Sequence, residues 1–199
     1  MHRLCWSAMR IIAGTLRSRR LEAPAGLATR PTSDRLRETL FNVLAPRIRG
    51  VSFLDLYAGS GAVGIEALSR GAARVEFVEK APVALKVLRG NLARLGLTAG
   101  FRIHAVAMGA FLRRASASDQ KPEHYDVAFL DPPWDAAPEY AATLGLLGGA
   151  ASGLLAEDAL VIAEHRRKER LEDRYGSLLR TRLLEQGDAA LSFYAATGE

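Results

Sequence analysis

The chain has 199 residues, of which 49% are hydrophobic and 25% are charged, and this composition suits one globular domain with a full core. The single cysteine, Cys5, excludes an intramolecular disulfide, and the four histidines show no metal-ligand spacing with it, so we expect no metal. No apolar run is long enough to span a bilayer, and residues 1–9 lack the hydrophobic centre of a signal peptide. We therefore expect a cytoplasmic protein without a membrane partner.

The positive charge is concentrated at the N-terminal end. Residues 1–50 contain ten arginines and three acidic residues, a formal charge of +7, and the net charge of +5 leaves −2 for the rest of the chain. Arginine suits phosphate because its planar fork can donate two hydrogen bonds to one group. The pattern favours contact with an RNA backbone over the alternative of a solvated basic face. The candidate phosphate contacts are Arg10, Arg17, Arg19, Arg20, Arg30, Arg35 and Arg37.

These arginines lie on a predicted N-terminal extension. Residues 1–8 are expected to be a disordered tail or an over-called start. The segments over 10–14 and 19–22 are expected to form a small β-hairpin. A helix is expected over 33–44, where Thr32 or Ser33 can act as the N-cap and Pro46 follows the end.

A short apolar strand over 52–57 runs into a glycine-rich loop and then a helix over 63–69. Gly59, Gly61 and Gly64 fit the G-x-G-x-x-G pattern, in which glycines let the backbone approach a pyrophosphate. Asp55, at the end of the strand, would repel a pyrophosphate but attract a cationic ligand. It therefore favours S-adenosylmethionine, which carries an ammonium and a sulfonium group and no phosphate, over NAD. The alternative is that Asp55 is a buried, hydrogen-bonded structural residue.

The next strand, over 74–79, ends in Glu79, where a carboxylate can accept the hydroxyl hydrogens of an adenosine ribose. This supports an adenosine ligand without choosing between the two cofactors. The helix that follows, over 82–95, carries apolar residues at helical spacing and is expected to be core. Tyr57, Ser60 and Lys80 flank these motifs and are assigned to the same cofactor site.

The motif Asp131-Pro132-Pro133-Trp134 follows an apolar strand that ends at Leu130. The exocyclic amine of a nucleobase or an amide is a poor nucleophile, because its lone pair is delocalised. If the Asp131 carboxylate and the Pro132 carbonyl both accept hydrogens from one NH2 group, the nitrogen is drawn toward tetrahedral geometry and its lone pair is freed. The prolines fix the loop, and Trp134 would stack on the ring. Taken alone, the motif is equally compatible with a strand-ending turn.

Seven apolar strands alternate with helical segments, which predicts an α/β fold with a mostly parallel sheet and helices on both faces. The strands are expected over 52–57, 74–79, 102–105, 127–130, 160–164, 180–185 and 191–195. In such a sheet the glycine loop, Glu79 and Asp131 lie along one carboxyl edge, where open α/β sheets bind ligands. The last two strands are joined only by residues 186–188, so the sheet should end in an antiparallel pair.

With these motifs in this order, the sequence resembles the class I S-adenosylmethionine-dependent methyltransferases, which are Rossmann-like. Within them it resembles the RsmD family of bacterial 16S rRNA guanine-N2 methyltransferases. The resemblance is carried by residues 9–14 (MRIIAG), 30–42 (RPTSDRLRETLFN), 55–61 (DLYAGSG), 66–71 (EALSRG) and 131–134 (DPPW). The segment over 30–42 is the specific part, because many amino-methyltransferases share the other motifs. The expected organisation is a single methyltransferase domain over 9–199, with a basic hairpin and helix extension over 9–50 and a catalytic sheet core over 51–199.

The resemblance implies that S-adenosylmethionine is the cofactor and that the substrate is a guanine N2 amine in small-subunit rRNA, within the assembled small ribosomal subunit. Trp134 stands where related proteins have Tyr or Phe, which preserves stacking. Ala107 stands where similar enzymes place an acidic or amide side chain on the adenine amino group, which leaves the Met108 backbone and apolar packing to hold the ring. We expect a monomer.

Two other functions remain compatible with the motifs. The nearer is methylation of another planar amine, such as adenine N6 in DNA or a glutamine amide, because the Asp-Pro-Pro-aromatic motif recognises the NH2 geometry and not the ring behind it. The more distant is a nucleotide-binding oxidoreductase or a non-catalytic RNA-binding module that uses the same glycine turn.

Overall fold

The computed structural model describes residues 9–23, 34–117, 124–133 and 136–197. The helices are α1 (Asp34–Leu44), α2 (Ala62–Ser69), α3 (Pro82–Arg94), α4 (Met108–Ser116) and α5 (Ala137–Leu147), with a 3-10 turn η1 (Ser152–Leu154). The strands are β1 (Ser52–Leu56), β2 (Arg74–Val78), β3 (Phe101–His104), β4 (Tyr125–Leu130), β5 (Leu155–Arg166), β6 (Arg174–Tyr175), β7 (Leu178–Gln186) and β8 (Ala189–Ala196). None of the helices in these ranges is long and apolar enough to cross a bilayer.

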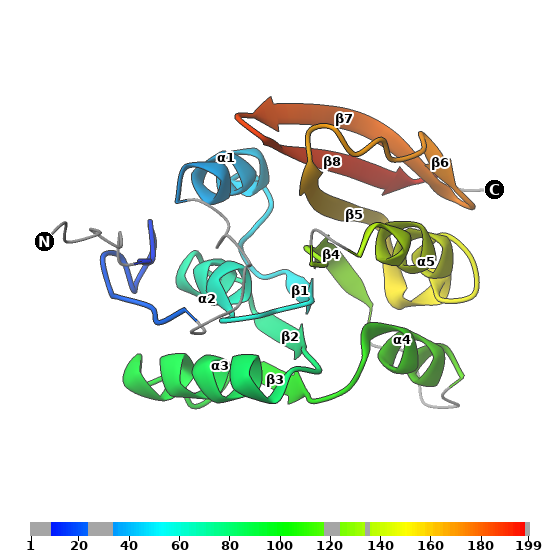
Figure 1. Ribbon diagram of the computed structural model, residues 1–199. Coiled ribbons are helices and arrows are strands. Elements are labelled where there is room, and N and C mark those ends of the chain that lie inside the picture. Colours follow the sequence, from blue (N-terminus) through cyan, green and yellow to red (C-terminus); the bar gives the residue numbers. More distant parts are fainter. Residues whose placement is uncertain (1–8, 24–33, 118–123, 134–135, 198–199) are drawn as a thin grey trace, which may run out of the picture.

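The strands form one mixed sheet in the order β3-β2-β1-β4-β5-β8-β7-β6, and Figure 1 shows it from β3 at the bottom to β7 at the top. Strands β1 to β5 run parallel to one another, whereas β8 runs antiparallel to both of its neighbours, β5 and β7. The chain builds outward from β1 to β3 and then continues on the other side of β1 with β4 and β5. The strand order therefore reverses between β1 and β4, and open α/β sheets bind ligands outside the carboxyl ends of the strands at such a point.

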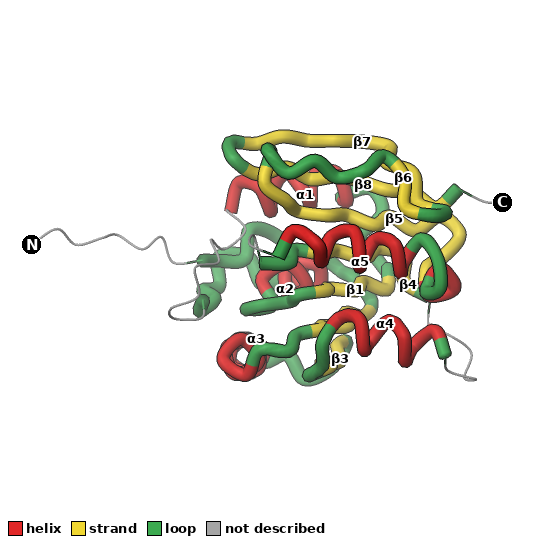
Figure 2. The backbone as a smooth tube through the Cα atoms, turned by 45° about the vertical axis from the view of Figure 1, so that its right-hand side comes forward, coloured by secondary structure: helices red, strands yellow, loops and turns green. Residues whose placement is uncertain are grey.

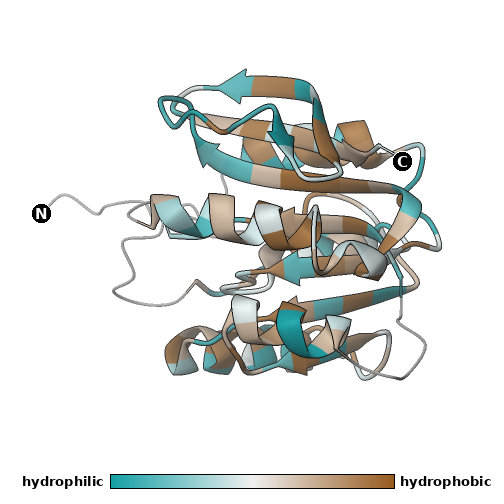
Figure 3. Ribbon diagram, turned by 90° about the vertical axis from the view of Figure 1, so that its right-hand side faces the viewer, coloured by the Kyte–Doolittle hydropathy of each residue, from teal (hydrophilic) through white to brown (hydrophobic). Residues whose placement is uncertain are grey.

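Helices lie on both faces of the sheet. Helices α1, α2 and α3 cover one face and α4 and α5 the other, as Figures 1 and 2 show from two directions. Each face has its own apolar core. One is centred on residues such as Phe41, Phe53 and Phe77, and the other on residues such as Leu130 and Leu144. The central strands β1 and β4 are buried on both faces, and most of their residues are apolar. Figure 3 shows brown stretches in the strands of the sheet.

The predicted α/β architecture is confirmed, including the antiparallel pair at the C-terminal end, β7 and β8. Strand β5 is longer than predicted: it begins at Leu155 and extends to Arg166. The sheet also has an eighth strand, β6, which pairs with β7 through two residues only. A segment that short carries no measurable period of two, so the sequence pattern could not reveal it.

The predicted N-terminal hairpin is present in a reduced form. Its two arms meet through one isolated antiparallel bridge between Arg10 and Arg20, and the turn between them packs on the end of α2. There the Thr15 N–H donates to the Ser69 carbonyl oxygen at 2.8 Å. Gly14 has φ +86°, and a Cβ at this position would lie 1.9 Å from the same Ser69 oxygen. Only glycine lets the hairpin approach the helix this closely.

Candidate active site

The point of reversal between β1 and β4 brings two acidic side chains together. Asp55 pairs with Phe129 of β4, so Asp131 follows two residues later at the end of that strand. Asp55 is 2% exposed, and its Oδ2 accepts a hydrogen bond from the Gly64 N–H at 2.9 Å. Burial raises the pKa of Asp55 to about 7, the Gly64 N–H opposes this, and the negative charge of Glu79 adds to it. Asp55 thus has the structural role that the sequence left open, and it also places a carboxyl group behind the glycine loop.

The glycine-rich loop is held by its own backbone and by the start of α2. The Gly61 N–H donates to the Ala58 carbonyl oxygen at 2.7 Å, and the Ile65 N–H donates to the Gly61 carbonyl oxygen at 2.8 Å. Gly64 faces β2, and a Cβ there would lie 2.3 Å from the Phe77 ring. The third glycine of the pattern therefore permits close packing of the helix on the strand, as in dinucleotide-binding turns.

Glu79 follows β2 and binds three backbone N–H groups. Its Oε2 accepts from Gly59 at 2.8 Å, and its Oε1 accepts from Lys80 at 2.8 Å and from Ala81 at 2.7 Å. The carboxylate thereby joins the glycine loop to the start of α3. A carboxylate offers about four acceptor positions, so Glu79 retains room for a further donor such as a ribose hydroxyl. The side chain of Lys80 is exposed.

Tyr57 begins the loop with a backbone φ of +63°. Its hydroxyl lies 2.7 Å from Glu139 Oε2 and 2.8 Å from Thr143 Oγ1, both on α5. Burial raises the pKa of the hydroxyl well above its usual range. The ring therefore ties the glycine loop to the opposite helical layer.

The two residues predicted beside adenine lie at the start of α4. Ala107 is exposed, whereas Met108 is buried and its sulfur accepts a hydrogen bond from Thr143 Oγ1 at 3.5 Å. Met108 is the first residue of the helix, so its backbone N–H has no partner within the helix. An N–H at the start of a helix can donate to a ligand.

Asp131 directly follows β4, and Pro132 is buried whereas Pro133 is exposed. The Pro133 carbonyl oxygen accepts a hydrogen bond from the Ala136 N–H at 2.8 Å, directly before α5. Trp134 lies outside the described residues. Burial raises the pKa of Asp131 well above its usual range, and the negative charges of Glu164 and Asp55 raise it further. Several acidic groups therefore face one small region at the carboxyl edge.

Glu164 belongs to this region and was missed in the sequence analysis. The pairing of Leu130 with Ala163 places Asp131 beside Glu164 on the neighbouring strand β5, and Glu164 is 3% exposed. The available signal was a lone carboxyl group at the end of an apolar strand, on the same edge as Asp131. The three carboxyl groups of Asp55, Asp131 and Glu164 come from three adjacent strands, and no group of three metal-ligand side chains is found within the described residues.

The predicted phosphate contacts divide into three groups. Those on the surface are Arg10, Arg17, Arg19, Arg20 and Arg35, all exposed, and Arg10 also lies 3.6 Å from Asp34. Arg30 lies outside the described residues. The prediction for Arg37 is wrong, because its side chain is 0% exposed and cannot reach an RNA phosphate in this structure.

Arg37 is instead the centre of a buried charge cluster. Its Nη2 donates to the Arg10 carbonyl oxygen and to Asp34 Oδ1, and its Nε lies 3.8 Å from Glu66 Oε2. Glu66, on α2, is also fully buried. Glu66 accepts the backbone N–H groups of Ile12 at 2.7 Å and Ala13 at 3.0 Å. The cluster therefore fastens the N-terminal hairpin and α1 to the helix that follows the glycine loop.

Asn91 on α3 makes a second buried link between the hairpin and the glycine loop. It is 1% exposed, and its amide nitrogen donates to the carbonyl oxygens of Glu22 at 3.0 Å and Ser60 at 2.9 Å. Its amide oxygen accepts the Glu22 N–H at 2.9 Å. Ser60 is thereby held through its backbone, and Asn91 acquires a role that the sequence did not suggest.

Replacing Asn91 with alanine is expected to lower the free energy of unfolding by about 1–3 kcal/mol, because it leaves polar backbone groups buried without partners. Denaturant unfolding measures the change. The matched control is Asn42→Ala, at an exposed position on α1. Equal stability of the two variants would show that Asn91 does not hold the loop.

Comparisons with known proteins agree with this arrangement. The family model described as "Conserved hypothetical protein 95" matches residues 9–195. The chain is 37% identical to "Putative rRNA methyltransferase YlbH" of Bacillus subtilis, over 96% of this chain and 100% of that protein. It is 40% identical to "Ribosomal RNA small subunit methyltransferase D" of Escherichia coli, over 78% of this chain and 74% of that protein.

A solved structure gives the same result in three dimensions. "Putative methyltransferase yhhF from Escherichia coli" superposes with a TM-score of 0.80 at 34% identity, over 95% of this chain and 98% of that chain. The chain therefore belongs to the "Conserved hypothetical protein 95" family, the family of RsmD and YlbH, and is a class I S-adenosylmethionine-dependent methyltransferase.

Proposed function

We propose that the protein transfers the methyl group of S-adenosylmethionine to the N2 amine of a guanine in small-subunit rRNA, within the assembled subunit. The observation that carries the proposal is the position of Asp131 and Pro132, which directly follow β4 beside β1 and the glycine loop. An amine held there lies next to the place where this fold binds a nucleoside cofactor. The curated relatives named as rRNA methyltransferases support RNA as the substrate.

The acidic edge of the sheet suits this cofactor. S-adenosylmethionine supplies a methyl group on a positively charged sulfur. Asp55, Glu79, Asp131 and Glu164 gather carboxyl groups along the edge, and the pKa values of Asp55 and Asp131 are raised there. A bound cation offsets this by favouring the ionised carboxylates, whereas the pyrophosphate of NAD would add further negative charge. In the proposed complex Gly59, Ser60 and Gly61 approach the donor with their backbone, and Glu79 accepts a ribose hydroxyl. Tyr57, Lys80 and Ala107 flank it, and Met108 contacts the adenine ring.

The acceptor side follows from hydrogen-bonding capacity. The guanine leaves its base stack and enters the site, as bases modified by enzymes do. Asp131 and the Pro132 carbonyl oxygen accept the two amine hydrogens, which aims the nitrogen lone pair at the methyl group. Asp131 then takes the proton that the nitrogen loses. Trp134 is proposed to stack on the base, and the exposed arginines of the N-terminal extension, with Arg30, are proposed to bind the RNA backbone.

Two measurements test the proposed class of activity. S-adenosylmethionine should raise the unfolding temperature of the purified protein and NAD should not, because a ligand that binds only the native state stabilises it. Labelled S-adenosylmethionine should then transfer its label to small-subunit rRNA from cells that lack the modification. Stabilisation by NAD alone would favour an oxidoreductase, and label in DNA or protein but not in rRNA would indicate another planar amine.

Replacing Glu79 with alanine is expected to weaken S-adenosylmethionine binding by about tenfold or more, since a hydrogen bond to a charged group is worth about 1.5–3 kcal/mol. The loss combines the ribose contact with the anchoring of the Gly59 N–H. Isothermal titration gives the dissociation constant, with Glu157→Ala at an exposed carboxylate as the control. An unchanged affinity would remove Glu79 from the cofactor site.

Replacing Glu164 with glutamine is expected to shift the acid limb of the pH profile of kcat/KM to lower pH. Asp131 must be ionised to accept hydrogens, so activity falls as the pH drops through its raised pKa. Glu164 is the neighbouring charge that raises this pKa most, and its neutralisation brings the pKa down. Glu157→Gln, at an exposed position of the same strand, is the control. If the acid limb of the pH profile stays at the same pH, Glu164 does not influence the pKa of Asp131.

A further inference from the structure

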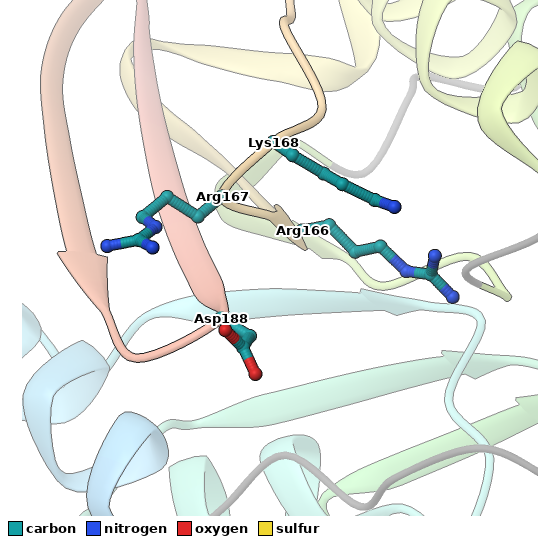
Figure 4. A pocket seen from close by; sticks show the side chains of 4 residues that line it. All are labelled: Arg166, Arg167, Lys168 and Asp188. Carbon is teal, nitrogen blue, oxygen red and sulfur yellow. The ribbon is translucent and has the colours of Figure 1, made fainter.

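A cavity of about 350 Å³ lies at the end of β5 and is lined by Arg166, Arg167, Lys168 and Asp188. Three of its four lining side chains are cations and one is a carboxylate, so the cavity carries an excess of positive charge. Figure 4 shows the side chains of Arg166 and Lys168 pointing the same way past the end of the strand, with Arg167 on the opposite side. We call this feature the β5 basic cavity.

The β5 basic cavity lies on the same edge of the sheet as the proposed amine site. Asp131 stands beside Glu164, and β5 continues for two more residues to Arg166, its last residue. At a rise of about 3.3 Å per residue, Arg166 is only about 7 Å beyond Glu164 along the strand. A polymer whose base reaches Asp131 therefore passes close to this cavity.

The cations are presented from fixed backbone rather than from a loose loop. The Arg167 N–H donates to the Asp188 carbonyl oxygen at 2.8 Å, which joins the end of β5 to the turn between β7 and β8. The Glu169 N–H donates to the Arg166 carbonyl oxygen at 2.9 Å and tightens the following turn. Both cavity walls are thus held by hydrogen bonds of the main chain.

The side chains of Arg167 and Lys168 are exposed, and neither forms an ion pair with any residue in the described ranges. Several other arginines, by contrast, form ion pairs: Arg47 with Asp158, Arg94 with Glu22 and Arg180 with Asp173. The run from Arg166 to Arg170 contains four cations and one acid. The charges of Arg167 and Lys168 are therefore available to an anionic ligand.

We propose that the β5 basic cavity binds a phosphodiester group of the acceptor RNA next to the nucleotide that enters the active site. The inference rests on the proposed function, because it takes RNA as the acceptor. S-adenosylmethionine has no phosphate, so the anion that accompanies the reaction is the backbone of the substrate. The N-terminal hairpin docks on α2 and α3, which cover the β1, β2 and β3 side of the reversal point, whereas the cavity lies on the β5 side. The RNA is then held on both sides of Asp131.

The double variant Arg167→Gln/Lys168→Gln tests the proposal against the matched control Arg113→Gln/Arg114→Gln. The control also removes two exposed cations, but at the end of α4, a helix that starts at the carboxyl edge and runs to the opposite edge. The dissociation constant for an rRNA fragment containing the acceptor is measured at several salt concentrations. Binding of S-adenosylmethionine and the unfolding temperature are measured in parallel.

The cavity variant is expected to bind the rRNA fragment about tenfold more weakly than the control. The slope of its log affinity against log salt concentration should be smaller in magnitude by about 1.4, which corresponds to two lost contacts to single-stranded phosphates. The loss should be similar for RNA fragments of different sequence, because phosphate contacts do not read bases. Cofactor binding and unfolding should not change. Equal affinity and equal salt dependence in both variants, with an active wild-type enzyme, would overturn the cavity proposal alone. A wild-type protein that neither binds nor methylates rRNA would overturn the proposed function and this inference with it.

Discussion

Replacing Asp131 with asparagine is expected to lower kcat for methyl transfer by about 100-fold or more, which is the usual contribution of a positioned proton acceptor. Asparagine keeps the size of the side chain, but it loses the negative charge and presents an NH2 group to a substrate that is itself a donor. The affinity for S-adenosylmethionine should change little by comparison. Single-turnover transfer with saturating cofactor measures the effect, and Asp158→Asn at an exposed carboxylate is the control.

The same substitution should make the protein more stable at neutral pH. A carboxyl group whose pKa is raised by folding destabilises the folded state once it ionises, and this cost grows as the pH rises from the ordinary Asp value through the raised one. Asparagine removes the cost. A variant that is inactive but unfolds at a higher temperature would mark Asp131 as a functional residue kept at the expense of stability. A variant that is active, or inactive only because it unfolds, would contradict this role.

Replacing Glu66 with glutamine is expected to lower the free energy of unfolding by about 3–5 kcal/mol, the usual effect of removing one member of a buried ion pair. Glu66 is fully buried against Arg37, and Arg70 Nε donates to its Oε1 at 2.7 Å. It also holds the N–H groups of Ile12 and Ala13, so hydrogen exchange at these two amides should accelerate.

Glu38→Gln is the matched control for Glu66→Gln, because Glu38 is an exposed glutamate on α1. Surface substitutions of this kind usually change stability by less than about 0.5 kcal/mol. If the Glu66 variant stays within that range, the buried cluster does not fasten the N-terminal extension to α2.

The sheet and the edge that carries the site could be predicted because each depends on a local pattern. An apolar run followed by glycines or by Asp-Pro identifies a strand and the loop at its carboxyl end. Parallel strands then bring Asp55, Glu79 and Asp131 to one edge without further information. The hydrogen-bond partners of Asp55 and Glu79 could not be predicted, because Gly64, Gly59 and the start of α3 reach these carboxyl groups only after the chain has folded.

Arg37 shows why the surface of the extension was harder to predict. Its position on α1 lies between Leu36 and Leu40, on the face that packs against the core. Arginine is rarely fully buried, so sequence alone assigns it to the surface. Its burial depends on Glu66, which is 29 positions away and reads as an ordinary helical glutamate. The ion pair of Arg37 and Glu66 forms only when α1 docks on α2.

The distribution of charge could also be predicted only in part. The net charge of residues 51–199 is −2, which suggested that only the N-terminal end is basic. That sum concealed the four cations between Arg166 and Arg170, because acids elsewhere compensate for them. Strand β5 was also predicted to end at residue 164, so the run was not connected with the carboxyl edge. The extension of β5 to Arg166 places it there.

The identity of the methylated nucleoside tests the central claim most directly. The purified protein is incubated with labelled S-adenosylmethionine and with either small ribosomal subunits or bare rRNA from cells that lack the modification, and the RNA is digested to nucleosides. We predict label in N2-methylguanosine, transferred more efficiently with assembled subunits and lost with Asp131→Asn. Label in any other nucleoside, or N2-methylguanosine formed equally well by the Asp131 variant, would contradict the account.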